Sequence, residues 1–359
     1  MSTDSRGTVA GRRPRLAFLL GDPNGIGPEI AVKLLTRPET HAAADVVVYT
    51  DPTMLAEGER VAGARVDMLR CAPGSLRFEP GRPTLVALDL IAAKAITPGE
   101  ATQAAGRAAL TALETAADAA QRGEVDGIVF APLNKHALRL GGLAQEDELR
   151  YLQEKFGVTG FVSEFNVTGA LWTSRVTSHI PLRAVADAIT GEGVRSAVRI
   201  ADRYLKAAGI AAPRIAVAGL NPHAGDSGSI GREEIDTIAP AIKRSRQEGI
   251  DARGPLSPDT LFLAARRGDF DAVVSMYHDQ GQIAMKLMGF DNGVTLHGGL
   301  PVPVTTCASG SAFDIVGRNV ARADGLVAAL DLAARIAERA LAGVGTGVAG
   351  GSPAQAARG

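Results

Sequence analysis

Short apolar runs alternate with longer segments of helical periodicity along most of the chain. The apolar runs are rich in β-branched residues and are bounded by Gly, Pro or Asp, which is typical of buried strands. The predicted strands are Leu16–Leu20, Val46–Tyr49, Thr84–Leu88, Gly127–Ala131, Ile215–Gly219, Ala272–Tyr277 and Val302–Thr306. The predicted helices are Glu100–Gln121, Glu192–Ala208, Arg232–Gln247 and Asp324–Ala342. This alternation predicts an α/β fold in which crossover helices cover a largely parallel sheet.

Composition narrows the class of protein. The 359 residues carry 38 Lys and Arg against 39 Asp and Glu, a balance that argues against nucleic acid or an anionic membrane as partner. No apolar run reaches the roughly 18 residues of a membrane span, and residues 1–13 lack the apolar segment of a secretory signal. Two distant cysteines, Cys71 and Cys307, exclude a disulfide framework. We therefore expect a cytoplasmic protein with flexible tails at 1–13 and 346–359.

Two polar segments follow predicted strands, which is where open α/β sheets bind their ligands. The segment 21–29, GDPNGIGPE, is a glycine-rich turn before a helix, and its backbone N–H groups would suit an anion. It lacks the GxGxxG spacing of a dinucleotide fingerprint, so a plain turn is the alternative. Lys135 follows a later strand as a candidate ligand-binding residue, with a solvated helix start as the alternative.

Three of the six histidines follow apolar runs directly: His179, His223 and His278. Three imidazoles leave one position of a divalent ion open, which is the pattern of a catalytic metal site. Each histidine alone is better explained as structural, but the three together favour a metal. Zinc is the first choice, and cobalt, nickel or manganese also suit these ligands. Asp279 is a candidate to orient the His278 ring, to bind the ion or to accept a proton.

Two further features favour a substrate and a nucleotide. Lys286 lies eight residues after His278, on roughly the same face of a helix, where its ammonium would hold a carboxylate or phosphate. A surface lysine is the alternative. The segment 305–319 passes from a strand end through small residues, and Gly310 and Ser311 there allow a cofactor to approach the backbone.

Six segments together resemble the 4-hydroxythreonine-4-phosphate dehydrogenase family of vitamin B6 biosynthesis and its catabolic relatives. They are GDPNGIGPE, APLNKHAL, TSHIPL, GLNPHAGD, MYHDQGQIAMK and SGSAFDIVGRN. The resemblance covers about residues 15–342. It implies two α/β/α domains with a cleft between them, similar to isocitrate and isopropylmalate dehydrogenases, in a homodimer whose active sites both subunits share. The implied domains are 14–138 plus 291–345 on the cofactor side, and 139–290 for metal, substrate and dimerisation.

The resemblance also assigns roles to single residues. It implies that His179, His223 and His278 bind the metal and that Lys286 binds substrate. NAD or NADP would lie against a loop that includes Ser309, Gly310, Ser311 and Asp314. Ser309 stands where a histidine is usual. The catalytic candidates are Asp279, Lys286 and Lys135.

The chain departs from this family at the substrate pocket. Members that use phosphorylated substrates carry Gly-His-Thr-Glu where residues 145–148 read Gln-Glu-Asp-Glu, so Glu146 and Asp147 replace two phosphate-binding residues. Thr295 replaces an Asn, and Val304 replaces an Arg. These changes remove phosphate ligands and add carboxylates that repel a phosphate. The candidate substrate-binding residues are Glu146, Asp147, Lys286 and Thr295.

The expected activity is a metal-dependent oxidation, by NAD or NADP, of a secondary alcohol in a hydroxy acid, with decarboxylation. The expected substrate is a phosphate-free carboxylated diol, such as a cis-dihydrodiol acid. The alternative within the family is a true 4-phosphooxythreonine dehydrogenase of pyridoxal phosphate biosynthesis. Alternatives of other classes are a metal-dependent hydrolase or aldolase without nicotinamide, and a non-catalytic sensor.

Overall fold

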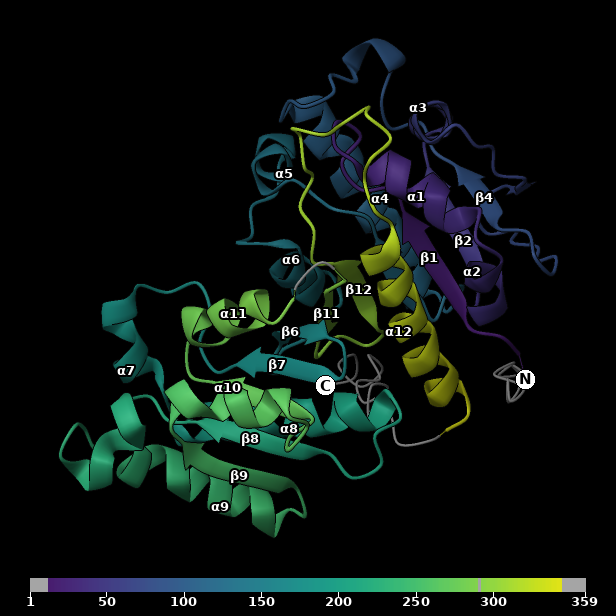
Figure 1. Cartoon of the computed structure of the whole chain (residues 1–359). Helices are drawn as coiled ribbons and strands as arrows, with labels where there is room; N and C mark the ends of the chain where they lie inside the picture. Colours follow the sequence, from purple (N-terminus) through teal and green to yellow (C-terminus); the bar gives the residue numbers. More distant parts are fainter. Residues whose placement is uncertain (1–11, 290–291, 344–359) are drawn as a thin grey trace, which may run out of the picture.

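The computed structural model describes residues 12–289 and 292–343, and the strands in these ranges form one continuous twelve-stranded sheet (Figure 1). In spatial order they are β3 (Leu69–Cys71), β4 (Thr84–Ala87), β2 (Asp45–Thr50), β1 (Arg15–Leu19), β5 (Gly127–Phe130), β12 (Val304–Cys307), β11 (Val294–Gly298), β6 (Ser163–Thr168), β7 (Leu171–Arg175), β10 (Ala272–Ser275), β8 (Arg214–Ala218) and β9 (Asp251–Leu256). All seven predicted strands form, each within two residues of its predicted bounds. The predicted α/β class is confirmed.

Helices connect most of the strands. The α-helices are α1 (Gly27–Leu35), α2 (Pro38–Ala43), α3 (Pro52–Ala62), α4 (Gln103–Gln121), α5 (Lys135–Gly141), α6 (Glu148–Lys155), α7 (Val185–Ala188), α8 (Gly191–Ala207), α9 (Ala239–Gln247), α10 (Pro258–Arg266), α11 (His278–Leu287) and α12 (Asp324–Leu341). Short 3-10 segments are η1 (Ala93–Ala95), η2 (Leu182–Ala184) and η3 (Pro222–Gly228), and η4 (Glu234–Ile238) is a π-helix. Helix α4 begins later than predicted because the Thr102 hydroxyl caps it, accepting from the Ala105 N–H at 3.2 Å.

Five strands were not predicted, and two of them reverse the direction of the chain within the sheet. Strand β11 is antiparallel to β12 and to β6, and β6 is antiparallel to β7. Strand β6 alternates polar and apolar residues from Glu164 onward, and β7 ends in three polar residues, so both lack the continuous apolar run on which the prediction relied. The sheet is therefore parallel on either side of its centre and antiparallel in the middle.

The hydrophobic core is continuous on one face of the sheet and divided on the other. On the first face, residues from nearly every strand pack with α1, α8 and α12 in one cluster. On the second face, one cluster joins α4 and α6 to β1, β2 and β5. A separate cluster joins α10 and α11 to β8 and β10. Between these two clusters, β6, β7 and β11 present polar side chains to the second face.

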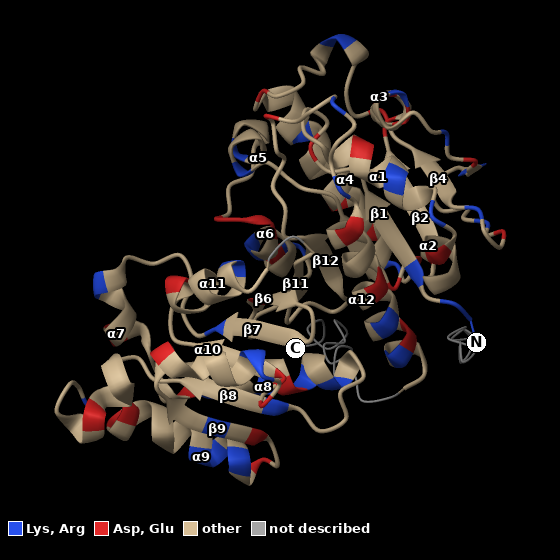
Figure 2. Ribbon diagram, in the orientation of Figure 1, with Lys and Arg blue, Asp and Glu red and all other residues tan. Residues whose placement is uncertain are grey.

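The predicted division into domains 14–138 plus 291–345 and 139–290 stays a prediction. Strands of the first group are contiguous in the sheet from β3 to β11, and those of the second from β6 to β9. The predicted tails, 1–13 and 346–359, fall almost entirely outside the described residues. Cys71 and Cys307 are both free thiols. Across the residues that the structure describes, no helix combines the length and apolar character of a membrane span. Acidic and basic residues are mixed over both halves (Figure 2).

A glycine sets the position of Lys135, the first residue of α5. A Cβ atom at Gly106 in α4 would lie 1.7 Å from the carbonyl oxygen of Ala137 in α5. The backbones of α4 and α5 therefore approach more closely than any side chain at position 106 allows. Gly141, at the other end of α5, makes a similar approach to the backbone of Gly106 and Arg107.

We expect Gly106→Ala to lower the free energy of unfolding by roughly 1–3 kcal/mol, because the added methyl group forces the two helices apart. This loss exceeds the gain of up to about 1 kcal/mol from replacing a helical glycine by alanine. Gly191→Ala, in the first turn of α8, is the control, since no atom lies within 4 Å of the added carbon. Urea denaturation measures both variants, and a Gly106→Ala protein as stable as the wild type contradicts the expectation.

Candidate active site

Strand direction places the predicted site residues at two opposite edges of the sheet. Strands β7, β10 and β8 are parallel neighbours, so His179, His278 and His223, which follow them, lie at one edge. The three antiparallel pairings between β12 and β7 make β5 and β12 run the opposite way. Lys135 and the loop 309–314 therefore belong to the other edge. A ligand that reaches both edges has to lie across the face of β6 and β11.

Two of the predicted metal ligands lie together, and each is paired with a carboxylate. The rings of His179 and His278 have centroids 5.5 Å apart. Nδ1 of His179 lies 2.5 Å from Oε1 of Glu146, and Nδ1 of His278 lies 2.7 Å from Oδ1 of Asp279. An ionised carboxylate accepts the Nδ1 proton and leaves Nε2 as the nitrogen that binds a metal. The donor set therefore fits a divalent ion at this point.

In the described part of the chain, His223 does not join His179 and His278 in a group whose ligand atoms all lie within 4.8 Å of one another. It is exposed on η3, where its backbone has a φ of 52° and Ala224, Asp226 and Ser227 also have positive φ. Glu234 holds the start of this loop by accepting hydrogen bonds from two backbone N–H groups, those of Leu220 and Asn221, each at 2.7 Å.

His223 lies close enough to Asp259, in the first turn of α10, for the two charges to interact. The Ser257 hydroxyl and, more weakly, the charge of His223 lower the pKa of Asp259 in the first turn of that helix. Over the described ranges, the group of three metal-binding side chains that the structure brings within 4.8 Å is instead Glu146, Asp147 and His179.

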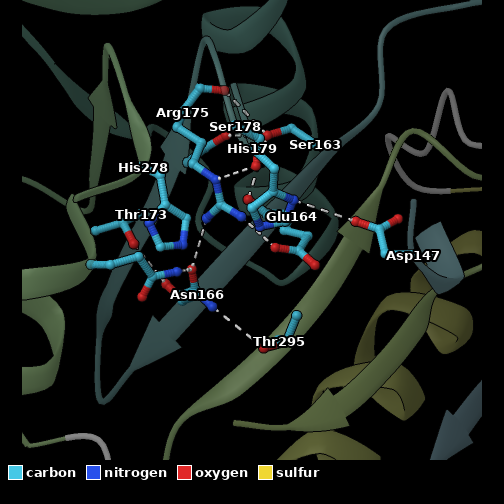
Figure 3. Close-up of polar contacts among 12 residues, drawn as sticks. Asp147, Ser163, Glu164, Asn166, Thr173, Arg175, Ser178, His179, His278 and Thr295 are labelled. Carbon is cyan, nitrogen blue, oxygen red and sulfur yellow. Dashed lines mark hydrogen bonds and ion pairs between the residues drawn. The ribbon is translucent and has the colours of Figure 1, made fainter. Parts of the chain in front are cut away.

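A polar surface covers the middle of the sheet, between the edge that carries His179 and His278 and the edge that carries Lys135. The sequence predicted only one of its six residues, Thr295. We call it the polar floor: Thr173, Arg175, Glu164, Asn166, Thr295 and His297, of which the first five are labelled in Figure 3. Asn166 is opposite Thr173 on one neighbouring strand and Thr295 on the other, and Glu164 is opposite His297. Polar residues at every second position of SEFNVT are the signal that could have revealed this surface, whereas the polar residues of LWTSR are consecutive.

Hydrogen bonds connect the polar floor. The side-chain Nδ2 of Asn166 donates to the Thr295 hydroxyl at 3.3 Å, and its side-chain Oδ1 accepts from Arg175 at 3.3 Å. Gln282 of α11 donates to the same Oδ1 atom at 2.5 Å. Lys286 is one helical turn beyond Gln282, so it lies on the side of α11 that faces the floor, although its side chain is exposed.

The charged centre of the polar floor is the ion pair between Glu164 and Arg175. The side chain of Arg175 is 5% exposed and that of Glu164 is 15% exposed. Burial alone would raise the pKa of Glu164, but the charges of Arg175, His297 and Lys135 lower it below its usual value. Glu164 is therefore ionised near neutral pH.

A pocket lies between α6 and the ends of β6 and β7, next to His179. Its lining is Glu146, Asp147, Leu149, Arg150, Phe161, Val162, Ser163, Glu164, Arg175, Val176, Ser178 and His179. Glu146 faces this pocket. Asp147 is buried and caps α6, accepting from the Arg150 N–H at 2.9 Å, while its other oxygen lies 3.8 Å from His179. Val304 is fully buried in the core.

The glycine-rich turn 21–29 and the loop 309–314 lie at the edge that carries Lys135, and they pack against each other. The Ile26 N–H donates to the Ser311 carbonyl at 3.0 Å, and a Cβ atom at Gly25 would lie 2.9 Å from Ser311. The Ser311 hydroxyl is buried without a hydrogen-bond partner among the described residues. Ser309, Gly310 and Asp314 are exposed, and a Cβ atom added at Gly310 would have no neighbouring atom within 4 Å. A loop with small, open residues and an unsatisfied donor fits a nucleotide.

Comparison with known proteins identifies the family. The model of the pyridoxal phosphate biosynthetic protein PdxA matches residues 42–333. The chain belongs to this family. It is 45% identical to the putative 4-hydroxythreonine-4-phosphate dehydrogenase 2 of Pseudomonas aeruginosa over 90% of this chain and 97% of that protein. Membership of the PdxA family makes the protein a dehydrogenase, in place of the hydrolase, aldolase and sensor alternatives.

Solved structures agree with the PdxA assignment. The 4-hydroxythreonine-4-phosphate dehydrogenase of Klebsiella pneumoniae matches with a TM-score of 0.77 and 35% identity, over 91% of this chain and 98% of that one. A terephthalate 1,2-cis-dihydrodiol dehydrogenase of Burkholderia xenovorans LB400 matches with a TM-score of 0.64 and 30% identity, over 90% of this chain and 98% of that one.

Asp22, in the turn after β1, is a buried carboxyl group without a cation beside it. The side chain is 1% exposed, Oδ1 accepts from the Asn24 N–H at 2.9 Å, and Oδ2 has no partner among the described residues. Burial raises its pKa from 3.8 to about 6. Between these pH values the folded protein binds more protons than the unfolded chain, so stability falls as the pH rises through this window.

We expect Asp22→Asn to remove this pH-dependent loss while keeping the hydrogen bond from Asn24. The free energy of unfolding should rise by about 3 kcal/mol at pH 7 and by little at pH 4, because the penalty is complete only above the folded pKa. Urea denaturation at the two pH values measures the difference. An equal change at both pH values would show that the carboxyl charge is not the cause.

Proposed function

We propose that the protein is a metal-dependent dehydrogenase that uses NAD or NADP to oxidise a secondary alcohol of a phosphate-free hydroxy acid, followed by decarboxylation. A carboxylated diol such as a cis-dihydrodiol acid is the proposed substrate. The supporting observation is Glu146, which lines the pocket and pairs with His179 where phosphate-using members of the family carry a phosphate ligand. A carboxylate there repels a phosphate, which carries nearly two negative charges at neutral pH.

His179, His223 and His278 are the proposed ligands of one divalent ion, with zinc as the first choice and cobalt, nickel or manganese as others. An ion there would lower the pKa of the substrate hydroxyl and stabilise negative charge on its oxygen. Glu146 and Asp279 hold the rings of His179 and His278 in the tautomer that binds metal. Because His223 does not join the other two in a close group within the described part of one chain, we propose that a homodimer whose subunits share the site completes it.

The remaining residues have roles in binding and proton transfer. The side chain of Asp279 is 72% exposed, so besides orienting His278 it is able to accept the hydroxyl proton or to pass it to water. Lys286 or Lys135, which lie near opposite ends of the polar floor, would hold the substrate carboxylate that leaves as CO₂. The loop from Ser309 to Asp314, together with the turn after β1, would bind the nicotinamide nucleotide.

A second candidate function within the family is the oxidation of 4-phosphooxythreonine. The names of the Pseudomonas and Klebsiella proteins favour it, whereas the name of the Burkholderia protein favours a dihydrodiol. Steady-state oxidation of both substrate types, with metal and with NAD or NADP, separates the two candidates. We expect turnover of a phosphate-free diol acid and at least tenfold lower kcat/KM for the phosphorylated substrate, and the reverse order would overturn the proposal.

We expect His179→Ala, His223→Ala and His278→Ala each to lose most of the bound metal, because two imidazoles hold a divalent ion far less tightly than three. His136→Ala, an exposed histidine of α5, is the matched control and should keep the metal content of the wild type. Elemental analysis after dialysis measures the metal per chain. Normal metal content in the His223→Ala protein would show that this residue is not a ligand.

A further inference from the structure

The Glu164–Arg175 pair forms one wall of the pocket beside His179. Both side chains line the pocket, and Arg175 is almost fully buried. Arg175 also donates from Nε to the Ser178 hydroxyl at 3.0 Å and from Nη1 to Asn166 at 3.3 Å. These bonds, with the one to Glu164, fix the guanidinium in place and leave two of its five N–H donors for a ligand.

The pocket is built for a neutral group and against a phosphate. Its lining carries three carboxylates, those of Glu146, Asp147 and Glu164, against the two guanidinium groups of Arg150 and Arg175. Arg150 is exposed and bonds Gln153 at 2.8 Å, so Arg175 is the buried cation of the lining, and Glu164 already neutralises it. A phosphate needs an uncompensated cation, preferably a guanidinium that binds two of its oxygens.

Val304 stands where the family resemblance implies an arginine. Because Thr305 pairs with Leu296, the preceding residue, Val304, lies beside His297, and His297 lies opposite Glu164. An arginine at 304 would therefore stand across His297 from Glu164. This chain carries a buried valine there and places its guanidinium on the far side of Glu164, bonded to that carboxylate. The guanidinium of this pocket is therefore held in an ion pair.

We propose that the Glu164–Arg175 pair recognises an uncharged hydroxyl group of the substrate, in the part of the pocket where a phosphate ester would otherwise lie. A hydroxyl both donates and accepts, so it bonds a carboxylate and a guanidinium at the same time. The inference rests on the proposed function and narrows its substrate class to acids that carry a further hydroxyl group beyond the one oxidised. Linear polyhydroxy acids and dihydrodiol acids share this chemistry.

The first test removes the charge that neutralises Arg175. In Glu164→Gln the guanidinium is uncompensated, so inorganic phosphate should become a competitive inhibitor at least tenfold stronger than with the wild type. Glu154→Gln is the control and should leave phosphate inhibition unchanged, because Glu154 is an exposed residue of α6 that does not line the pocket. Unchanged inhibition of a folded Glu164→Gln protein would overturn the proposal.

A second variant is needed because the unpaired buried guanidinium of Arg175 in Glu164→Gln could prevent that protein from folding. Arg175→Met/Glu164→Met replaces the pair by apolar side chains, a change that buried ion pairs often tolerate. The KM for a linear trihydroxy acid and for a dihydrodiol acid should rise about tenfold while kcat changes little, since the pair contacts the substrate away from the reacting carbon. An unchanged KM for both acids would contradict hydroxyl recognition.

Substrate comparison with the wild type separates this inference from the proposed function. The assay uses a linear trihydroxy acid, its terminal phosphate ester, a dihydrodiol acid and a matched acid with a single hydroxyl group. Turnover confined to the phosphate ester contradicts the proposed function itself. Turnover of the single-hydroxyl acid as efficient as that of the polyhydroxy acids contradicts only the hydroxyl recognition. Preference for the linear or the cyclic acid identifies which of the two is the source of the hydroxyl group.

Discussion

The reversal of chain direction at β11 and β6 is the constraint on which the rest of the structure depends. Because of it, the loops after β5 and β12 and those after β7, β10 and β8 belong to opposite edges of one sheet. The core is continuous on one face but divided on the other, where β6, β7 and β11 lie between two groups of helices. The polar floor lies in this gap, between the edge that carries His179 and His278 and the edge that carries Lys135.

Carboxylates determine the charge of the site beside His179. Glu146 and Asp279 each bond a histidine that is a candidate metal ligand, and Glu164 neutralises the buried Arg175. The first two act through the rings that they orient, whereas the third changes what the pocket is able to bind. Glu146 and Glu164 therefore support the proposed class of substrate, a hydroxy acid whose far end is uncharged, whereas Asp279 acts only on His278.

Much of the fold was predictable from the sequence, because seven buried strands have continuous apolar runs. The strands of the polar floor were not, since β6 alternates polar and apolar residues and β7 ends in three polar ones. His179, His223 and His278 were predicted to lie together, and the structure brings His179 and His278 together. Glu146 was identified only as a departure from the family pattern. Its bond to His179 depends on the path of the loop before α6, which no local signal encodes. The same holds for Glu164 and Arg175, which meet only because β6 pairs with β7.

The measurement that tests the central claim most directly is equilibrium binding to the metal-loaded wild-type protein. Isothermal titration with a linear trihydroxy acid and with its terminal phosphate ester compares two ligands that differ only in the disputed group. The account predicts that the free acid binds at least about tenfold more tightly, because Glu164 already compensates the buried guanidinium of the pocket lining, that of Arg175. Tighter binding of the phosphate ester would contradict it.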